Sequence, residues 1–299
     1  MSTFSRDLIG RSGYANEGFA DHYDGARPSP PAVVVDVLTR CAGGRPRLVV
    51  DLGSGTGLSS RAWAARAERV VGVEANPAML ARAQATTADA SVTFVEAYAD
   101  ATGLAAGSAD IVTCAQSFHW MDPGAVLPEV VRVLRPGGVF GAYDYDVVPV
   151  IEPQVDEAFA AVIDVRWAAR ERLGIHAGAS QWPKREHVAR LHESGLFAFA
   201  REVHCHAETT ADAEAVIDLA HSLGGPTAIF EGRAPELDET MNALVRIARE
   251  RLPEPRPMLI GYTIRLGITP RPRRALQGRD RTVTDQAAGV AAISGRSRR

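Results

Sequence analysis

The segment VVDLGSGTGLSS, residues 49–60, could bring the polypeptide backbone close to a ligand. After an apolar run, its small residues are Gly53, Ser54, Gly55, Thr56 and Gly57. Because glycine lacks a Cβ, a strand-to-helix turn built on it exposes backbone N–H groups and the helix N-terminus. Such a turn suits a nucleotide or nucleoside above the carboxyl end of the strand. No Gly-Lys-Ser/Thr follows, so this is not a Walker phosphate loop.

Two acidic residues narrow the choice of ligand. Glu74 lies about 20 residues beyond the first glycine, where a carboxylate can accept hydrogen bonds from both ribose hydroxyls. Nicotinamide and flavin enzymes share that arrangement. Asp51 stands two residues before the first glycine, where it would repel a pyrophosphate but attract an ammonium or sulfonium group. S-adenosylmethionine carries both cations, a ribose and no phosphate, so the residues favour this cofactor.

The elements that must position these residues alternate along the first half of the chain. Short apolar runs predict strands at 47–53, 69–75, 92–97, 109–117 and 139–146, with helical segments at 32–44, 58–67, 76–86 and 124–134. This alternation indicates an α/β fold, a doubly wound parallel sheet with helices on both faces. After Pro149 the pattern becomes mainly helical, at 154–173, 182–195, 212–223 and 236–252, with strands at 199–210 and 257–269.

Five motifs in order, FADHYDGARPSPP, VVDLGSGTGLS, VVGVEANPAML, EAYADATGLAAGSADIVTCAQSFHWMD and VVRVLRPGGVF, carry a family resemblance over roughly residues 14–270. The chain resembles class I S-adenosylmethionine-dependent methyltransferases, specifically the small-molecule type 11 group, which includes trans-aconitate methyltransferase-like enzymes. The resemblance implies a Rossmann-like sheet of seven strands, the last antiparallel, with a helical cap. It implies one methyltransferase domain over 1–270, with an amino-terminal lid at 1–31 and the cap inserted at 150–194.

Roles for individual residues follow from the resemblance, position by position. Asp51 and the glycine-loop residues would hold the methionine part of the cofactor, and Glu74 its ribose. Ala75 and Met79 would line the adenine, and Asp100 would meet the adenine amino group beside Ala99 and Ala101. Gln116 would face the sulfonium. In the lid, Tyr23 would lie near the cofactor and Arg27 could pair with its carboxylate.

The methyl acceptor is expected to lie beside the segment QSFHWMD. His119 is the candidate catalytic base, with a structural role as the alternative, while His22, Phe118 and Trp120 would contact the substrate. A hydroxyl acceptor would need such a base, whereas a carboxylate would need only alignment. The predicted reaction is methyl transfer to a small molecule, at a carboxylate or hydroxyl oxygen. The alternatives are a nicotinamide-dependent oxidoreductase and a non-catalytic cofactor-binding regulator.

Composition points to a globular protein without nucleic-acid or membrane partners. The chain has 299 residues, 46% of them hydrophobic, and a formal charge of −3. Residues 271–299 hold eight arginines and two aspartates, a basic tail with too little apolar surface to order. Three isolated cysteines lack metal-site spacing, so we expect no metal and a reducing cytoplasm. No stretch has the length and apolarity of a signal peptide or a membrane span.

Overall fold

The computed structural model describes residues 27–174, 182–223, 230 and 232–271. Most of the predicted lid (1–26), part of the predicted cap (175–181) and nearly all of the basic tail (272–299) therefore lie outside the described residues. His22 and Tyr23 fall in the first of these segments. Among the described residues, no helix is both long and apolar enough to cross a membrane.

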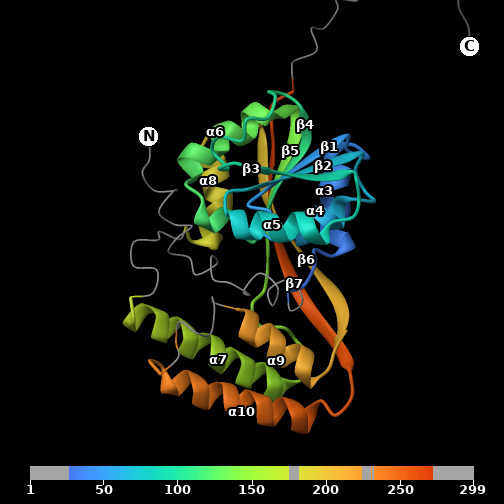
Figure 1. Ribbon diagram of the computed structural model, residues 1–299. Helices are drawn as coiled ribbons and strands as arrows, with labels where there is room; N and C mark the ends of the chain where they lie inside the picture. Colours follow the sequence, from blue (N-terminus) through green and yellow to red (C-terminus); the bar gives the residue numbers. More distant parts are fainter. Residues whose placement is uncertain (1–26, 175–181, 224–229, 231, 272–299) are drawn as a thin grey trace, which may run out of the picture.

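A seven-stranded sheet forms the centre of the molecule, in the order β3-β2-β1-β4-β5-β7-β6 (Figure 1). The strands are β1 (Leu48–Leu52), β2 (Arg69–Glu74), β3 (Val92–Glu96), β4 (Ala109–Ala115), β5 (Leu134–Tyr145), β6 (Phe199–Ala211) and β7 (Arg256–Ile268). All neighbours are parallel except β7, which runs antiparallel to both β5 and β6. The predicted doubly wound α/β sheet with an antiparallel last strand is confirmed.

Helices cover both faces of this sheet. The covering elements are α3 (Ala32–Ala42), α4 (Leu58–Trp63), α5 (Pro77–Thr86), α6 (Pro123–Val133) and α8 (His187–Glu193). Apolar residues of α3 and α4 enter one core cluster with Val49 and Ile111, and those of α6 and α8 enter a second with Val50 and Phe140. Successive strand residues point to opposite faces, so these fully buried apolar strands supply both cores.

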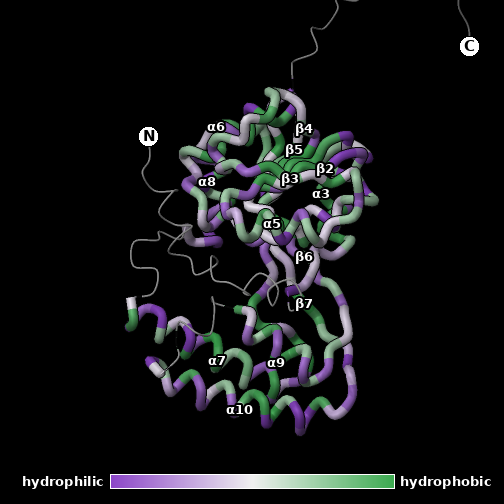
Figure 2. The backbone as a smooth tube through the Cα atoms, in the orientation of Figure 1, coloured by the Kyte–Doolittle hydropathy of each residue, from purple (hydrophilic) through white to green (hydrophobic). Residues whose placement is uncertain are grey.

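A second helical layer lies beyond one end of the sheet and consists of α7 (Pro153–Arg172), α9 (Ala213–Ser222) and α10 (Pro235–Arg251) (Figure 1). The long pair β6 and β7 reaches from the sheet to this layer, and their register continues over 13 residue pairs. Figure 2 shows apolar residues on the facing sides of these helices. Of the predicted cap, α7 lies in this layer, whereas α8 packs on β6 and β7 of the sheet.

Two local signals explain where the helices beside the sheet begin. Asn76 caps α5 by accepting hydrogen bonds from the backbone N–H groups of Ala78 and Met79, with Pro77 as the first helical residue. Asp122 caps α6 in the same way, followed by Pro123. Both caps stand directly after a segment at the carboxyl edge of the sheet, so they bring the first turns of α5 and α6 to that edge.

Candidate functional site

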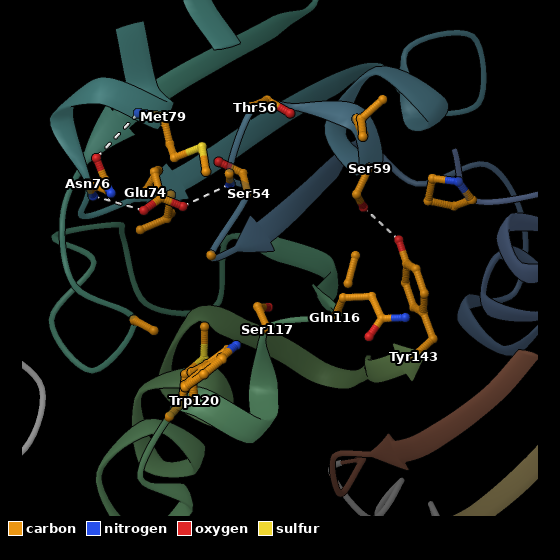
Figure 3. A pocket seen from close by; sticks show the side chains of 18 of the residues that line it. Ser54, Thr56, Ser59, Glu74, Asn76, Met79, Gln116, Ser117, Trp120 and Tyr143 are labelled. Carbon is orange, nitrogen blue, oxygen red and sulfur yellow. Dashed lines mark hydrogen bonds between the residues drawn. The ribbon is translucent and has the colours of Figure 1, made fainter. Parts of the chain in front are cut away.

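A cavity lies at the carboxyl ends of β1, β2, β4 and β5 and extends to β7 (Figure 3). Eleven of the residues predicted for the site line it: Arg27, Gly53, Ser54, Gly55, Thr56, Glu74, Ala75, Met79, Ala99, Gln116 and Trp120. The cavity therefore forms where the parallel strands deliver their loops to a single edge, which is the usual place for a ligand in a doubly wound sheet.

The glycine loop turns sharply between β1 and α4, and its three glycines have positive φ angles of 64°, 57° and 85°. Their roles differ. A Cβ on Gly53 would lie 2.8 Å from the Ser117 Cβ, and one on Gly57 would lie 2.8 Å from the Phe94 ring. A Cβ on Gly55 would meet nothing within 4 Å. Gly55 therefore leaves open space on the cavity side, while Gly57 serves packing and does not line the cavity.

Glu74 joins the end of β2 to the glycine loop. Its Oε2 accepts a hydrogen bond from the Gly55 backbone N–H at 2.8 Å, and its Oε1 accepts one from the Asn76 N–H at 2.8 Å (Figure 3). Burial raises the pKa of this carboxyl, against the lowering effect of the backbone hydrogen bonds. The carboxylate thus orients the loop while it stays at the cavity wall, the position predicted for a ribose contact.

Asp51, predicted to contact the methionine part of the cofactor, does not line the cavity. Its side chain is fully buried and accepts hydrogen bonds from the hydroxyls of Ser60, at 2.7 Å, and Thr113, at 2.9 Å. Burial raises its pKa to about 6, although those hydroxyls oppose the shift. The physical reason for the difference is that residue 51 is still within β1 and points between the sheet and α4. Its charge can act on the cavity only across intervening groups.

The residues predicted for the adenine side separate into those that line the cavity and those that do not. Ala97, Tyr98 and Ala99 line the cavity, but Asp100 and Ala101 do not and are exposed. The Ala101 backbone N–H donates to the Tyr98 carbonyl, so the chain turns away from the cavity after residue 99. That turn places Asp100 on the outer surface.

In the short 3-10 helix η1 (Phe118–Trp120), the three neighbouring side chains point in different directions. Trp120 enters the cavity, as predicted for a substrate contact. Phe118 instead is buried in the core, 5.3 Å from the Phe140 ring centre and 4.7 Å from that of His187. At about three residues per turn, adjacent side chains of a 3-10 helix point in different directions, so Phe118 cannot share the cavity with Trp120.

His119, the predicted base, lies outside the cavity wall. Its Nδ1 is 3.9 Å from the Asp144 Oδ1, and Nδ1 has no hydrogen-bond partner among the described residues. Burial, followed by the positive charge of Lys184, holds the pKa of His119 well below its usual value. The imidazole is therefore neutral at physiological pH, and a water or a rearrangement would be needed to connect it with a ligand.

Gln116 occupies a strained position at the end of β4. It is the one residue other than glycine with positive φ among those described, at 52°. Its Oε1 accepts a hydrogen bond from the Lys184 Nζ at 2.7 Å, and the same ammonium lies 2.7 Å from the Asp144 Oδ1. Unfavourable backbone conformations persist where surrounding contacts impose them, and they concentrate at functional sites. Lys184 is the first residue of the 3-10 helix η2 (Lys184–Glu186), which precedes α8, so its contacts tie this segment to the cavity.

Three tyrosines complete the wall and were missed in the sequence. Tyr143 and Tyr145 come from β5, and Tyr262 comes from the antiparallel β7. The Tyr143 hydroxyl lies 2.6 Å from the Ser59 hydroxyl (Figure 3), and the Arg27 guanidinium donates to the Tyr145 hydroxyl. The alternation Tyr-Asp-Tyr at 143–145 was a usable signal for a shared strand face. No sequence signal placed Tyr262 opposite Tyr145, since that contact depends on β-strand pairing.

Within residues 27–174, 182–223, 230 and 232–271, no group of three or more histidine, cysteine, aspartate or glutamate residues could hold a metal ion. The three cysteines are free.

Comparison with known proteins agrees with this geometry. Residues 50–142 match the family described as "Methyltransferase domain". An uncharacterized methyltransferase of Mycobacterium tuberculosis is 39% identical over 119 residues, which is 40% of this chain and 47% of the relative. A trans-aconitate 2-methyltransferase of Methylobacterium radiotolerans is 31% identical over 127 residues, 42% of this chain and 46% of that enzyme. The chain thus spans about half the length of the curated relatives that it matches.

A solved structure from Anaeromyxobacter dehalogenans, provisionally described as a type II methyltransferase, resembles most of this chain. It is 27% identical and covers 82% of this chain and 99% of that chain, with a TM-score of 0.57. The similarity therefore extends beyond residues 50–142 to the strands and helices that follow.

Proposed function

We propose that this chain, which contains a domain of the class I S-adenosylmethionine-dependent methyltransferase family, transfers a methyl group from that cofactor to an oxygen of a small molecule. The observation that carries the proposal is the open space at Gly55 beside the Glu74 carboxylate, at the carboxyl edge of the sheet. A bare backbone next to an acidic group accommodates a ribose closely and offers no cation for a pyrophosphate.

The described residues fit the parts of S-adenosylmethionine. Glu74 and Asn76 would face the ribose, while Met79, Ala97 and Ala99 would border the adenine. The glycine loop and Gln116 would surround the methionine part. Bound there, the cofactor would supply a methyl carbon made electrophilic by positive sulfur.

The chain's own contribution to such a reaction is alignment and exclusion of water. Trp120, Tyr143 and Tyr145 contribute aromatic rings to the lining of the cavity, where an acceptor would contact them. Aromatic rings are large and have few rotatable bonds, so they can hold a small molecule in one orientation.

A carboxylate is the acceptor that these residues favour. An anionic oxygen attacks without a base, which agrees with the position of His119 outside the cavity wall and with its lowered pKa, which makes the imidazole a weak base. One relative is named for methylation of trans-aconitate, a small carboxylate, and this supports the same class here. A hydroxyl acceptor is the second candidate, because His119 is adjacent to Trp120, with ring centres 5.1 Å apart.

Calorimetry with S-adenosylhomocysteine and NADH tests the cofactor, and transfer of a radiolabelled methyl group to a panel of small acids and phenols tests the reaction. We expect S-adenosylhomocysteine to bind and NADH not to bind. Tight NADH binding without S-adenosylhomocysteine binding would support the oxidoreductase alternative. Cofactor binding with no transfer to any acceptor would favour the non-catalytic regulator.

A further inference from the structure

An arginine occupies the core of the helical layer beside the cavity. On the buried face of α7, Arg166 follows Phe159 and Val162 at helical spacing and is only 1% exposed. Burying a guanidinium removes its hydration, which is costly unless hydrogen bonds and an opposite charge replace the water. The partners of Arg166 therefore indicate what the position is for.

Only one nitrogen of this guanidinium is satisfied. Nη1 donates to the Leu223 carbonyl and lies 3.5 Å from that of His221, at the carboxyl end of α9. Nε and Nη2 are buried and have no hydrogen-bond partner in the described part of the chain. These two nitrogens share one edge of the guanidinium and point their N–H bonds in parallel. That edge matches the two oxygens of a carboxylate or phosphate.

The charges around Arg166 do not neutralise it. Burial first, then the positive charges of Arg170 and Arg27, lower its pKa to about 10. No ion pair joins Arg166 to a carboxylate among the residues that the structure describes. Even with the lowered pKa the guanidinium is charged at neutral pH, so the helical layer holds a buried cation that has no anionic partner among the described residues.

Arg27 connects this cation to the cavity. It lines the cavity, donates to the Tyr145 hydroxyl and lies with its guanidinium carbon 5.9 Å from the Tyr145 ring centre. Its Nη2 donates at 2.8 Å to the carbonyl of Ser222. Since Arg166 binds the carbonyls of the residues on either side of Ser222, the two guanidinium groups are neighbours at the end of α9. Arg166 therefore stands directly behind the part of the wall formed by Arg27 and Tyr145.

We propose that the Nε–Nη2 edge of Arg166 binds the acidic group of the methyl acceptor, a carboxylate or a phosphate, on the α9 side of the cavity. The inference rests on the proposed methyltransferase function and adds to it an acidic group of the acceptor, separate from the oxygen that receives the methyl group. A capping role at α9 requires only Nη1 and leaves this edge unexplained. An acceptor anchored here would carry its acid group towards the helical layer and extend its reacting oxygen past Tyr145 towards the cofactor.

The test compares acids with their neutral amides on the full chain saturated with S-adenosylhomocysteine. The probes are trans-aconitate, phenylacetate and phenyl phosphate, with phenylacetamide and aconitamide as neutral partners, titrated by calorimetry. We expect at least one acid to bind the parent protein at least about 10-fold more tightly than its neutral partner, as a charge-assisted bidentate pair requires. The ratio of the carboxylates to phenyl phosphate identifies which oxyanion the site takes.

Arg166→Met should remove the preference for the acid and leave the affinity for S-adenosylhomocysteine within about 2-fold of the parent value. Arg172→Met is the matched control: Arg172 lies on the same helix but is exposed and paired with Glu236. It should keep the preference. Arg166→Lys retains the charge without the two parallel donors, so an intermediate preference is expected.

The outcomes separate this inference from the proposed function. Binding of S-adenosylhomocysteine without any acid preference in the parent protein would overturn the inference alone. No binding of S-adenosylhomocysteine would overturn the proposed function, and titration of the acids without it would still report on Arg166. If Arg166→Met does not fold, the acid-to-amide ratio of the parent and of Arg166→Lys decides. A preference that Arg166→Lys leaves undiminished would contradict a bidentate contact.

Discussion

The parallel part of the sheet and the helical layer treat buried charge in opposite ways. Beside β1 and β2, Asp51 is held by two hydroxyls and Glu74 by two backbone N–H groups. In the helical layer, Arg166 has two buried nitrogens, Nε and Nη2, without partners among the described residues. A carboxylate whose oxygens accept hydrogen bonds holds the surrounding backbone in place. A buried guanidinium with unpaired nitrogens still has donors for a further ligand. The first region thus fits the cofactor edge, and the second holds the buried guanidinium to which we assign the acidic group of the acceptor.

The region that matches the methyltransferase family coincides with the first of these two regions. It covers residues 50–142 and therefore contains the glycine loop, Glu74 and Gln116 but neither α7 nor α9. Of the residues proposed for the acceptor side, Tyr143, Tyr145 and Arg166 lie outside that match, whereas Trp120 lies within it. If cofactor binding depends on the first region, substitutions of Gly55 and Glu74 should have the largest effects, and the pH dependence at Asp51 and the substitution of His119 should follow with smaller ones.

Gly55→Val should give the largest effect. Its Cβ would enter the open space beside the cavity, so we expect the affinity for S-adenosylhomocysteine to fall by about 100-fold or more, roughly 3 kcal/mol. The left-handed backbone adds about 1–2 kcal/mol of strain. Gly107→Val is the control, because Gly107 has a φ of +66°, open surroundings and no place in the cavity wall. Equal loss of binding in both variants would mean that strain, not occupancy of the cavity, is responsible.

Glu74→Ala should follow. It removes an acceptor for the Gly55 and Asn76 N–H groups together with the proposed ribose contact, so we expect a loss of about 2–4 kcal/mol in S-adenosylhomocysteine binding. Glu96 stands opposite Glu74 in the β2–β3 register but is exposed, so Glu96→Ala is the matched control. Calorimetry measures both. An unchanged affinity in Glu74→Ala would refute the ribose assignment.

The buried carboxyl of Asp51 should make the free energy of unfolding depend on pH. Its pKa rises from 3.8 to about 6 on folding, so between these values the folded state binds more protons than the unfolded state. The free energy of unfolding should therefore fall as the pH rises through this window, by up to roughly 3 kcal/mol, and should not change further above it. Urea titrations from pH 4 to 7 would show this slope in the parent and a shallower one in Asp51→Asn. Identical slopes would show that another group titrates.

His119→Ala should give the smallest effect. If the acceptor is a carboxylate, kcat should stay within about 10-fold of the parent, because alignment rather than proton removal limits the reaction. No acid limb from His119 is expected near pH 6.5, since burial lowers its pKa. Kinetics against pH for the parent, His119→Ala and His119→Gln provide the measurement. A loss of 10²–10⁴-fold in both variants would make His119 a general base and the acceptor a hydroxyl.

Much of the fold followed from local patterns. Alternating apolar strands and helices predicted the doubly wound sheet, and the resemblance added the antiparallel last strand that the structure confirms. The strand-end positions of Glu74 and Gln116 placed both at one edge, since carboxyl ends of parallel strands converge there. The glycine loop was recognisable because only glycine tolerates its backbone without strain.

The sequence by itself determined the sheet, its order of elements and the cofactor edge, because these depend on periodicity and on residues close together in the chain. Only the tertiary structure decided which neighbouring side chains line the cavity. In the 3-10 helix η1, Trp120 lines the cavity, whereas Phe118 and His119 do not. Burial of Asp51 depends on α4 packing over β1. In the sequence, Arg166 stands among the apolar positions of a recognisable helix, four residues before Arg170. That two of its nitrogens lack partners among the described residues is evident only in the structure, where α9 packs beside α7. Which charges lack partners depends on contacts between distant segments, and local sequence does not encode those contacts.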